Sequence, residues 1–477
     1  MSRTCFEVPS KTPTPSLLLR LPVELLLEIL IWYKHIVNPS SAFSHGIKDL
    51  HSEFRYPTEP LPETDNRASR AILLLGSLSL GIRNVAWATP QLWSHISITL
   101  IGESEHLKLQ LAGLASWLVR SGTSSLHIRL QCSTDPSPST DEHWSQYPPL
   151  QAVDTILPHC HLIEELCLVL PFECYIQLFQ NKYAPQMRLL QRLTLFFRPK
   201  WLGNSRPTPL DLTALPALTE ASLLNFPSRK LAPSLPINHI SRFRVHHVGL
   251  AHALDVVRTA SLLEACTLTW ALGYPEAAAP VHHSRLRTLK VEGSTTPLRH
   301  LTLPALEQLY VKTRRMFVGS QCVQLIQRSG CTLSSLWISA ETLRASDLID
   351  CLVETPALRS LRVYNRFERL DSLFRGPLIQ CLTLQEGETT LVPRLEHLEV
   401  LGCSCNFSVE SLAMMLESRW CGGVDKGKRK QSGLGNFTLV ASREASITIR
   451  EDVMCSPSIR RLVEQGMIVS VQVAESK

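Results

Sequence analysis

An apolar pattern, L-x-x-L-x-L with related apolar residues allowed, recurs eleven times between residues 163 and 400. The spacing of its fourth and sixth positions predicts a short strand with one buried face in every unit. Such a unit cannot bury its apolar face alone, so successive units are expected to stack into an array. The units are Ile163/Leu166/Leu168, Leu190/Leu193/Leu195, Leu218/Ala221/Leu223, Ile240/Phe243/Val245, Leu263/Cys266/Leu268, Leu286/Leu289/Val291, Leu306/Leu309/Val311, Leu333/Leu336/Ile338, Leu358/Leu361/Val363, Ile379/Leu382/Leu384 and Leu395/Leu398/Val400.

The spacing of these units and the placement of proline both indicate true repeats. The steps between middle residues are 27, 28, 22, 23, 23, 20, 27, 25, 21 and 16. Most fall within the range of roughly 20 to 29 residues found in leucine-rich repeats. Because proline cannot donate to a sheet ladder, a position just ahead of a strand suits it. Proline stands two residues before the first apolar position of five units, at Pro216, Pro304, Pro356, Pro377 and Pro393.

Segments between the predicted strands show the apolar spacing of helices. Each unit is therefore predicted to be a strand plus a helix, and residues 101–470 to form an irregular α/β solenoid of leucine-rich-repeat type. Weaker terminal units are expected at 123–128 and 434–439, beyond loops at about 133–149 and 421–433. The helical spacings include Leu348, Ile349, Leu352 and Val353 before one unit and Leu412, Met415 and Leu416 after the last clear one.

A different apolar segment, LPVELLLEIL, lies at residues 21–30. Pro22 suits the first position of a helix, and Glu24 and Glu28 would share one face. The remaining residues are apolar over most of the circumference, so one face can enter a local core while the other needs a second cover. A partner protein is one candidate for that cover, and burial within a larger domain is the other.

The segments around this helix differ in composition. Residues 1–16 are polar and contain three prolines, which predicts a flexible lead, and residues 34–70 predict a loop or insertion. Residues 71–85 suggest a second helix weakened by Gly76 and Gly81. The segment AWATPQLWSHI then follows at residues 86–96.

Residues 17–100 resemble an F-box domain, particularly the version found in large fungal families. In that version an LPxEllxeI helix is followed by a helix that ends in an ATPxLWs-like segment. The segments DLIDCLVETPALRSLRV and SVESLAMMLESRW resemble the repeat region of the same families. The resemblance implies a short all-α N-terminal domain ahead of the repeats. It rests on Leu21, Pro22, Glu24, Leu25, Ile29, Leu30, Ala88, Thr89, Pro90, Leu92 and Trp93.

The resemblance also implies a function. The N-terminal helices would dock onto the small Skp-family adaptor of a cullin-type ubiquitin ligase, and the repeats would hold a protein to be ubiquitylated. Catalysis would then belong to the partners, so the chain itself is expected to be no enzyme and to need no cofactor. The residues expected to contact the adaptor, or to support that contact, are Leu21, Pro22, Leu25, Ile29, Leu30 and Trp93.

Two alternatives stay open. The first is a repeat scaffold whose F-box-like segment only caps the solenoid. It stays open because Ser79, Leu80, Gly81 and Ile82 stand where the family commonly has Cys, basic residues and Trp. The second is an enzyme that uses a cleft in the repeats, although no local motif of a hydrolase, kinase or dehydrogenase is present.

Charge and composition limit the classes of partner that are expected. The chain is 44% hydrophobic and 19% charged, as expected of a folded protein. Its formal charge is +6, but Lys426, Lys428, Arg429 and Lys430 less Asp425 supply +3 within one loop. The rest of the chain is nearly balanced in charge, so nucleic acid is not the expected partner. That loop is either a nuclear localisation signal or a solvated insertion. We therefore expect a cytoplasmic or nuclear protein.

No apolar run reaches the roughly 18 residues that span a bilayer, so no membrane partner is expected. The 14 cysteines include no CxxC pair, which favours free thiols over a disulfide scaffold or a zinc site. The pairs His246/His247 and His282/His283 are the nearest approach to metal ligands. Because adjacent strand residues point to opposite faces, neither pair is expected to chelate a metal, and both are interpreted as surface or loop histidines.

The strands also predict a binding surface. Template positions three, five and seven should project onto the concave face of the sheet, and the residues there are mainly basic and aromatic. From Leu190 to Leu395, six Lys or Arg residues oppose Glu220, Glu292 and Glu399. The face is therefore either a recognition surface for an acidic or phosphorylated partner segment or merely the solvated face of a sheet, and the sequence leaves both open. The candidate residues are Arg192, Phe196, Arg242, Arg244, Lys290, Tyr310, Lys312, Trp337, Arg362 and Tyr364, with His246, Glu292, His397 and Glu399 beside them.

Overall fold

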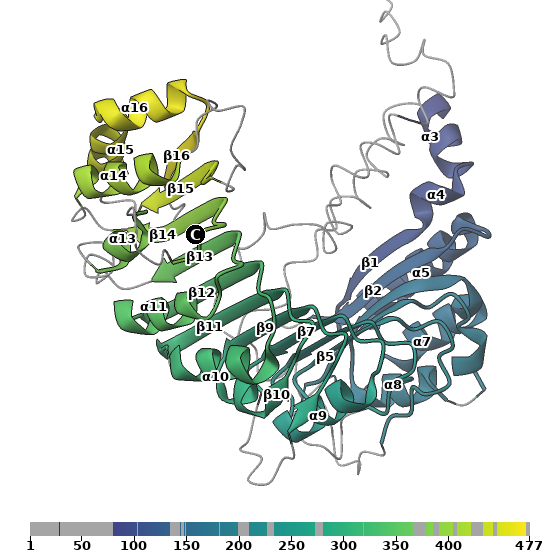
Figure 1. Cartoon of the computed structure of the whole chain (residues 1–477). Helices are drawn as coiled ribbons and strands as arrows, with labels where there is room; N and C mark the ends of the chain where they lie inside the picture. Colours follow the sequence, from purple (N-terminus) through teal and green to yellow (C-terminus); the bar gives the residue numbers. More distant parts are fainter. Residues whose placement is uncertain are drawn as a thin grey trace, which may run out of the picture. The chain divides into compact units, whose positions relative to one another are not determined.

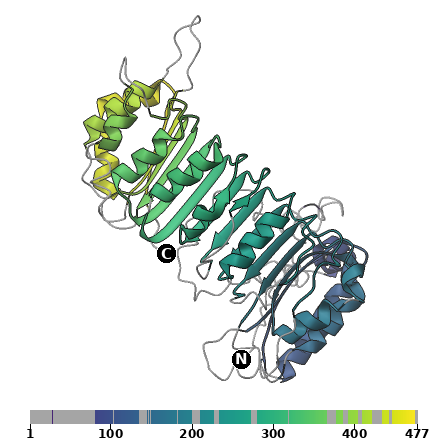
Figure 2. The same ribbon diagram turned by 60° about the horizontal axis from the view of Figure 1, so that its bottom comes forward.

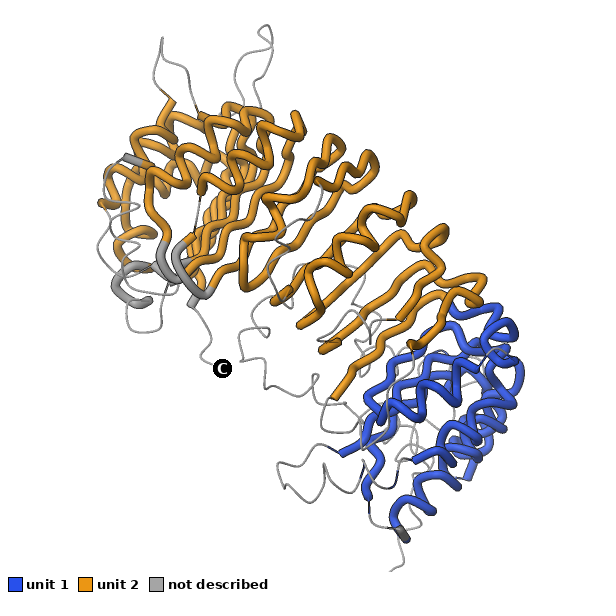
Figure 3. Tube along the Cα trace, turned by 90° about the horizontal axis from the view of Figure 1, so that it is seen from below, with its two compact units in different colours: residues 1–190, 199–204 blue, residues 191–198, 205–477 orange. Residues whose placement is uncertain are grey.

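The computed structural model of the chain describes residue 28 and residues 80–473, apart from 103, 134–143, 145–146, 148, 181, 199–208, 227–232, 272–279, 318, 366–376, 385–390, 404–407, 421–432 and 442–445. Two compact units are present (Figure 3). Unit 1 comprises residues 1–190 and 199–204, and unit 2 comprises residues 191–198 and 205–477. The predicted adaptor residues from Leu21 to Leu30, the insertion at 34–70 and the basic loop at 426–430 lie outside the described residues.

Unit 1 contains three parallel strands in the order β1-β2-β3, and helices connect them (Figure 1). At residues 95–100, inside the segment predicted to be all-α, β1 is a strand that pairs with β2 along its whole length. The described elements are α3 (Leu80–Trp87), α4 (Pro90–Trp93), β1 (His95–Leu100), α5 (Ser104–Ser121), β2 (Leu126–Cys132), α7 (Leu150–Ile156), β3 (Ile163–Val169) and α8 (Phe172–Leu178), with 3-10 turns at Leu157–Leu162 and Ala184–Gln186.

Unit 2 contains a long parallel sheet in which sequence order and spatial order agree, β4-β5-β6-β7-β9-β11-β12-β13-β14-β15-β16. A separate two-stranded ladder joins β8 (Val281–His282) to β10 (Leu301–Thr302). The strands of the long sheet are β4 (Arg192–Phe196), β5 (Glu220–Leu224), β6 (Arg242–His246), β7 (Ala265–Thr269), β9 (Thr288–Gly293), β11 (Gln308–Met316), β12 (Ser335–Thr342), β13 (Ser360–Asn365), β14 (His397–Cys403), β15 (Asn436–Ala441) and β16 (Ile468–Val473).

The described helices of unit 2 lie along one face of this sheet (Figures 1 and 2). We call the opposite face, which carries no described helix, the open face. No helix in the described part of the chain combines the length and apolarity needed to cross a membrane. The helices are α9 (Leu250–Thr259), α10 (Gly319–Ser329), α11 (Ala345–Val353), α13 (Pro377–Leu382), α14 (Val409–Arg419), α15 (Ser446–Cys455) and α16 (Pro457–Glu464), with a 3-10 turn at Thr296–His300.

The core of unit 2 is built from the template positions of the repeats. In the unit around β12, Leu333, Leu336 and Ile338 are at most 1% exposed, and Trp337 between the last two points to the open face. The same alternation of buried and half-buried residues runs through β4, β5 and β6. The predicted α/β class with a parallel sheet is confirmed, because a strand lies in ten of the eleven predicted units.

Proline takes part in the turn that leads into a strand. Leu358 donates its N–H to the carbonyl oxygen of Thr355 at 3.1 Å, with Pro356 at the second position of that turn. Leu306 makes the same bond to Leu303 at 3.1 Å across Pro304. Proline at this position fixes φ for the turn and loses no ladder hydrogen bond.

The prediction of a strand at Ile379/Leu382/Leu384 is wrong, because residues 377–382 form α13. Pro377 occupies the first helical position, where its missing N–H has no cost. The buried side chains are Leu378, Ile379 and Leu382, which lie on one side of a helix as readily as the template residues alternate in a strand. A short apolar run satisfies both periods, and here the helix covers the sheet.

A helix was predicted in every unit. The described residues between β4 and β5, and between β5 and β6, contain no helix. These described residues include Pro209 and Pro216 in the first connection and Pro233 and Pro236 in the second. Proline inside a helix removes a hydrogen bond and clashes with the preceding turn, which accounts for the absence of a helix in these residues.

Two arginines hold connections of unit 2 against the helix layer. Arg419, at the end of α14, is 2% exposed and donates to the carbonyl oxygens of Leu382, Val392 (3.0 Å) and Leu391 (2.7 Å). Arg328 of α10 similarly donates to carbonyl oxygens of Leu298 and Leu301. Burial lowers the pKa of Arg419 to about 10, so it remains charged at neutral pH.

Candidate recognition surface on the open face of unit 2

The strand register of unit 2 places five of the predicted open-face positions in one line. Lys290 of β9 lies opposite Tyr310 of β11, which lies opposite Trp337 of β12. Trp337 lies opposite Arg362 of β13, and Arg362 lies opposite Glu399 of β14. Parallel strands bring such partners to neighbouring places on one face. We call Lys290, Tyr310, Trp337, Arg362 and Glu399 the central row.

Side chains of the central row contact one another in sequence. The Lys290 ammonium lies 4.8 Å from the centre of the Tyr310 ring, and the Arg362 guanidinium lies 5.8 Å from that of Trp337. The Tyr310 and Trp337 rings meet edge to face, with centres 4.2 Å apart. Cation–π and edge-to-face contacts hold long side chains in defined positions. The row therefore presents a preorganised aromatic pair with a cation at each end.

Carboxylates accompany both cations. Lys290 Nζ is 2.8 Å from Glu292 Oε1, and Arg362 Nε is 2.8 Å from Glu399 Oε2. The four side chains are 12–24% exposed, so both pairs are partly shielded from water. A third pair joins Arg242 to Glu220 at 3.4 Å. Three of the six predicted basic residues thus lie beside a carboxylate, and the face carries both signs of charge.

A second cluster lies at the carboxyl ends of neighbouring strands. The residues just after β5, β6 and β7 are Asn225, His247 and Trp270, and all three have positive φ, of 67°, 51° and 48°. His247 donates its N–H to Thr269, the last residue of the next strand, at 3.0 Å, and Trp270 makes the same bond to Glu292 at 2.8 Å. These residues therefore extend the ladder by one step while turning the chain off the sheet.

The side chains of this cluster stack. The His247 and Trp270 rings are nearly parallel, at 8° with centres 6.2 Å apart, and His246 meets His247 edge to face at 4.4 Å. Gly293 of β9 leaves room for the Trp270 ring, because a Cβ on Gly293 would lie 2.6 Å from that ring. Its φ of 92° also suits glycine. The indole of Trp270 thus lies directly over a residue that has no side chain.

The prediction for the histidine pairs is partly wrong. His246 and His247 were expected on opposite faces, yet their rings touch because His247 lies beyond the strand end in the left-handed conformation. Burial, followed by the nearby His247, lowers the pKa of His246 to about 4, so its ring is neutral at pH 7. The buried His283 ring bonds to Ala260 and Leu286. Among the described residues no group of three potential ligands could hold a metal ion.

The other predicted open-face residues share the face of the central row. Arg192 and Phe196 are on β4, Arg242 and Arg244 on β6, Lys312 on β11 and Tyr364 on β13. The register aligns Arg244 with Lys290 through Thr267 of β7, and the other five residues lie in the rows on either side. Sequence reasoning missed Trp270 and Gly293, which follow template positions; an aromatic residue just after one strand and a glycine at the end of the next is the signal that could have found them.

Trp93 is the one predicted adaptor residue inside the described region, and it is buried, with 3% exposure. Its indole donates to the carbonyl oxygen of Ala86 at 2.8 Å, and its ring centre is 6.3 Å from that of Trp117 in α5. Trp93 precedes the buried Ile96 by three residues, as Leu190 precedes Leu193 in the repeats. It therefore fills the first apolar position of a repeat and joins α3, α4 and α5.

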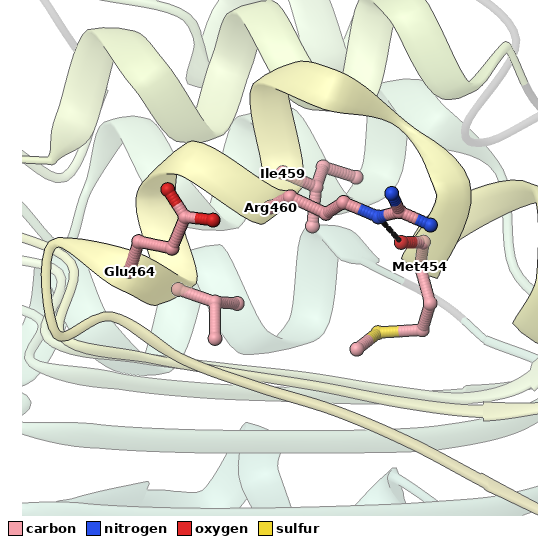
Figure 4. Close-up of a pocket in the computed structure, with 5 residues that line it drawn as sticks. Met454, Ile459, Arg460 and Glu464 are labelled. Atoms are coloured by element: carbon pink, nitrogen blue, oxygen red, sulfur yellow. Dashed lines mark hydrogen bonds between the residues drawn. The ribbon is translucent and has the colours of Figure 1, made fainter.

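Two further features are chemically less suited to function. A hollow of about 150 Å³ lies between α15 and α16, lined by Met454, Ile459, Arg460, Val463 and Glu464 (Figure 4). Arg460 donates to the Met454 carbonyl oxygen there at 2.9 Å. Ligand pockets for metabolites are usually about 300 Å³ or more.

Most of the described cysteines are buried. Burial raises the pKa of Cys167 to about 11 and that of Cys266 to about 12. A thiol with such a pKa is protonated at neutral pH and is a poor nucleophile. The central row and the strand-end cluster are therefore the strongest candidates for function in the described part of the chain. In comparisons with known proteins, no family model and no curated protein matches this chain.

Proposed function

We propose that this chain is a non-catalytic recognition protein that holds a polypeptide on the open face of unit 2. The observation that carries the proposal is the central row, in which an aromatic pair lies between two cations that are each beside a carboxylate. Tyr, Trp and Arg are the residues that most often dominate the energy of protein interfaces. A leucine-rich-repeat-like solenoid provides such a face without a catalytic cleft.

The chemistry of the row favours a particular kind of segment. An apolar or aromatic side chain can pack on Tyr310 and Trp337, and polar groups on either side can exchange with the existing ion pairs. An acidic or phosphorylated segment, the partner predicted from sequence, would compete with Glu399 for Arg362. Because both carboxylates are already in place, the apolar anchor is expected to matter more than the net charge of the partner.

The wider proposal is a substrate-recognition subunit of a cullin-type ubiquitin ligase, acting in the cytoplasm or nucleus. It rests on the F-box resemblance of Leu21 to Leu30 and of Ala88 to Trp93. In this role the N-terminal segment binds a Skp-family adaptor, and the open face binds the protein to be ubiquitylated. Leu25 and Ile29 provide the test, because both belong to the apolar helix that would meet the adaptor.

The experiment separates the two interfaces. Full-length chain is co-expressed with the adaptor, and Leu25→Asp with Ile29→Asp should abolish co-purification of the adaptor. Trp337→Ala with Arg362→Glu should leave adaptor recovery unchanged and reduce ubiquitylated proteins captured with the complex at least about tenfold. The matched control is Arg359→Glu, the same charge change at a half-exposed ion pair with Glu396. Unchanged capture by the double variant would exclude the open face as the site.

The second candidate is a repeat scaffold in which the F-box-like segment caps the array. Trp93 favours it, because the side chain occupies the first apolar position of a repeat and packs on α5. The cluster of Ile82, Ala86, Leu92 and Trp93 gives α3 and α4 a structural role in unit 1. A chain that folds normally and never recovers the adaptor would favour this scaffold.

A further inference from the structure

The last strand of unit 2, β16, has an unpaired edge in the described structure. Its sequence, IVSVQV, is rich in β-branched residues and contains neither a charge nor a proline. Natural proteins usually protect edge strands with charged residues, proline, bulges or a covering segment. β16 contains no charged residue and no proline, and its pairing with β15 is regular over all six residues, without a bulge.

Hydrogen bonding shows which groups point outward. Ile468 donates its N–H to Gly435 at 3.1 Å, on the side of β15. Because backbone groups alternate along a strand, the N–H and C=O groups of Val469 and Val471 point away from β15. No described residue bonds to these outward groups. The edge therefore offers donors and acceptors in the spacing that another strand requires.

The side chains of β16 are also incompletely covered. Phe437 and Leu439 of β15 are 1% and 2% exposed on the helix side of the sheet. Val469 and Val471 occupy the same positions in β16 and are only half-buried. Ile468 on the open face is 61% exposed. One more strand beside β16 would bury these apolar groups as β16 buries those of β15.

We propose that the occupant of this edge is β16 of a second copy of the chain, paired antiparallel about a twofold axis. In a register centred on Ser470, Val469 of one copy lies opposite Val471 of the other, and the two Ser470 side chains face each other. The outward groups of Val469 and Val471 then bond to each other, since opposite residues with outward groups form the hydrogen-bonded pairs. No like charges come together across the strands.

Head-to-tail pairing with the other outermost strand is disfavoured. On the outward side of β1, the Gln110 side chain of α5 donates to the Thr99 carbonyl oxygen at 2.7 Å and accepts from the Ile101 N–H at 3.0 Å. Two of the outward groups of that edge are therefore already bonded. Twofold pairing of β16 closes on itself and leaves no further edge of this kind, so it gives a dimer and not a fibre.

The test measures the mass of the full-length chain by analytical ultracentrifugation over a range of concentrations. We expect a reversible dimer of twice the 53.5 kDa chain mass. Val471→Pro removes an outward N–H without touching the ladder to β15, and should leave a monomer with an unchanged circular dichroism spectrum. A wild-type chain that stays monomeric would overturn the proposal, and so would a dimer that survives this variant.

A charge exchange tests the register without introducing proline. Ser470→Lys and Ser470→Glu each place like charges opposite one another, which should raise the dimer Kd at least about tenfold. Mixing the two variants should restore a dimer, because the charges are then opposite. Thr438→Lys is the control, since it adds the same charge to the same face one strand inward. Variants that fail to complement on mixing, or a monomer that binds an extended peptide at this edge, would contradict the proposal.

Discussion

The outermost strands β1 and β16 end their sheets in different ways. On β1, Ile96 and Leu100 are at most 1% exposed, and the Gln110 amide occupies outward backbone groups. On β16 no residue with a described side chain is fully buried, and the outward groups of Val469 and Val471 have no described partner. One amide from a connecting helix thus bonds two of the outward groups of β1. Among the described residues no side chain does the same at the β16 edge, which leaves that edge available for pairing.

The largest expected effect on stability comes from a substitution at the β1 end of the sheet. Trp93→Ala should lower the free energy of unfolding by about 3–5 kcal/mol, because it empties a core position and removes the bond to Ala86. Urea unfolding followed by circular dichroism measures the change. The control is Trp87→Ala on the neighbouring helix, where the side chain is 45% exposed and the cost should be under about 1 kcal/mol. Equal costs for the two variants would show that Trp93 does not anchor this end.

A smaller effect is expected near the β16 end, at Arg419. Arg419→Met should destabilise the chain by about 2–4 kcal/mol, because three carbonyl oxygens lose their donor and Met restores none of these bonds. The urea midpoint is the measurement. Arg461→Met is the matched control, since its ion pair with Glu417 is largely exposed and should contribute no more than about 1 kcal/mol. If both variants behave alike, burial of Arg419 is not what holds the connection.

Acid should affect unit 2 through His246. Its folded pKa, about 4, is below the ordinary 6.5, so the unfolded chain binds the proton first as the pH falls. The neutral-ring contribution is complete above pH 6.5 and is lost between pH 6.5 and about 4, amounting to about 2 kcal/mol after allowance for partial exposure. His246→Gln should remove that part of the pH dependence. A wild-type minus variant difference that is constant with pH would refute the assignment.

The smallest effect is expected from a substitution that leaves outward backbone groups of β1 without a partner, as on β16. Gln110→Leu should cost about 1 kcal/mol in unfolding free energy, because the Thr99 carbonyl and the Ile101 N–H lose a partner. It should also produce new self-association in ultracentrifugation, since the edge becomes available. Lys108→Leu adds the same apolar side chain at an exposed position of α5 and controls for non-specific association. Association of both variants to the same extent would argue against edge protection by Gln110.

Most of the strands could be predicted from three apolar template positions, but β16 could not, because one of its positions lacks an apolar side chain. The register places Val469 and Val471 of β16 beside Phe437 and Leu439, which puts Gly466 at the first template position. Gly466 has a φ of 99° and supplies no apolar side chain, so the pattern does not register there. At β1 the first position is Trp93, an aromatic residue that also matches the F-box-like segment.

The sequence was sufficient to predict which face of the sheet carries the candidate site, but not how its side chains contact one another. Alternation correctly placed Lys290, Tyr310, Trp337 and Arg362 on one side of the sheet. It did not predict the pairing of Lys290 with Glu292 or of Arg362 with Glu399, because counting charges ignores which side chains are within reach. Contacts across a strand depend on rotamers as well as register, and rotamers are set by packing that a pattern does not contain.

The close approach of Gly293 to Trp270 restricts which amino-acid substitutions this protein can accept as it evolves. A side chain at residue 293 would collide with the Trp270 ring, at 2.6 Å from the first added carbon. The two positions, 23 residues apart in the chain, are therefore bound to a fixed order of mutation. The indole at 270 must become smaller before a side chain at position 293 has space, and the φ of 92° would strain that side chain even then.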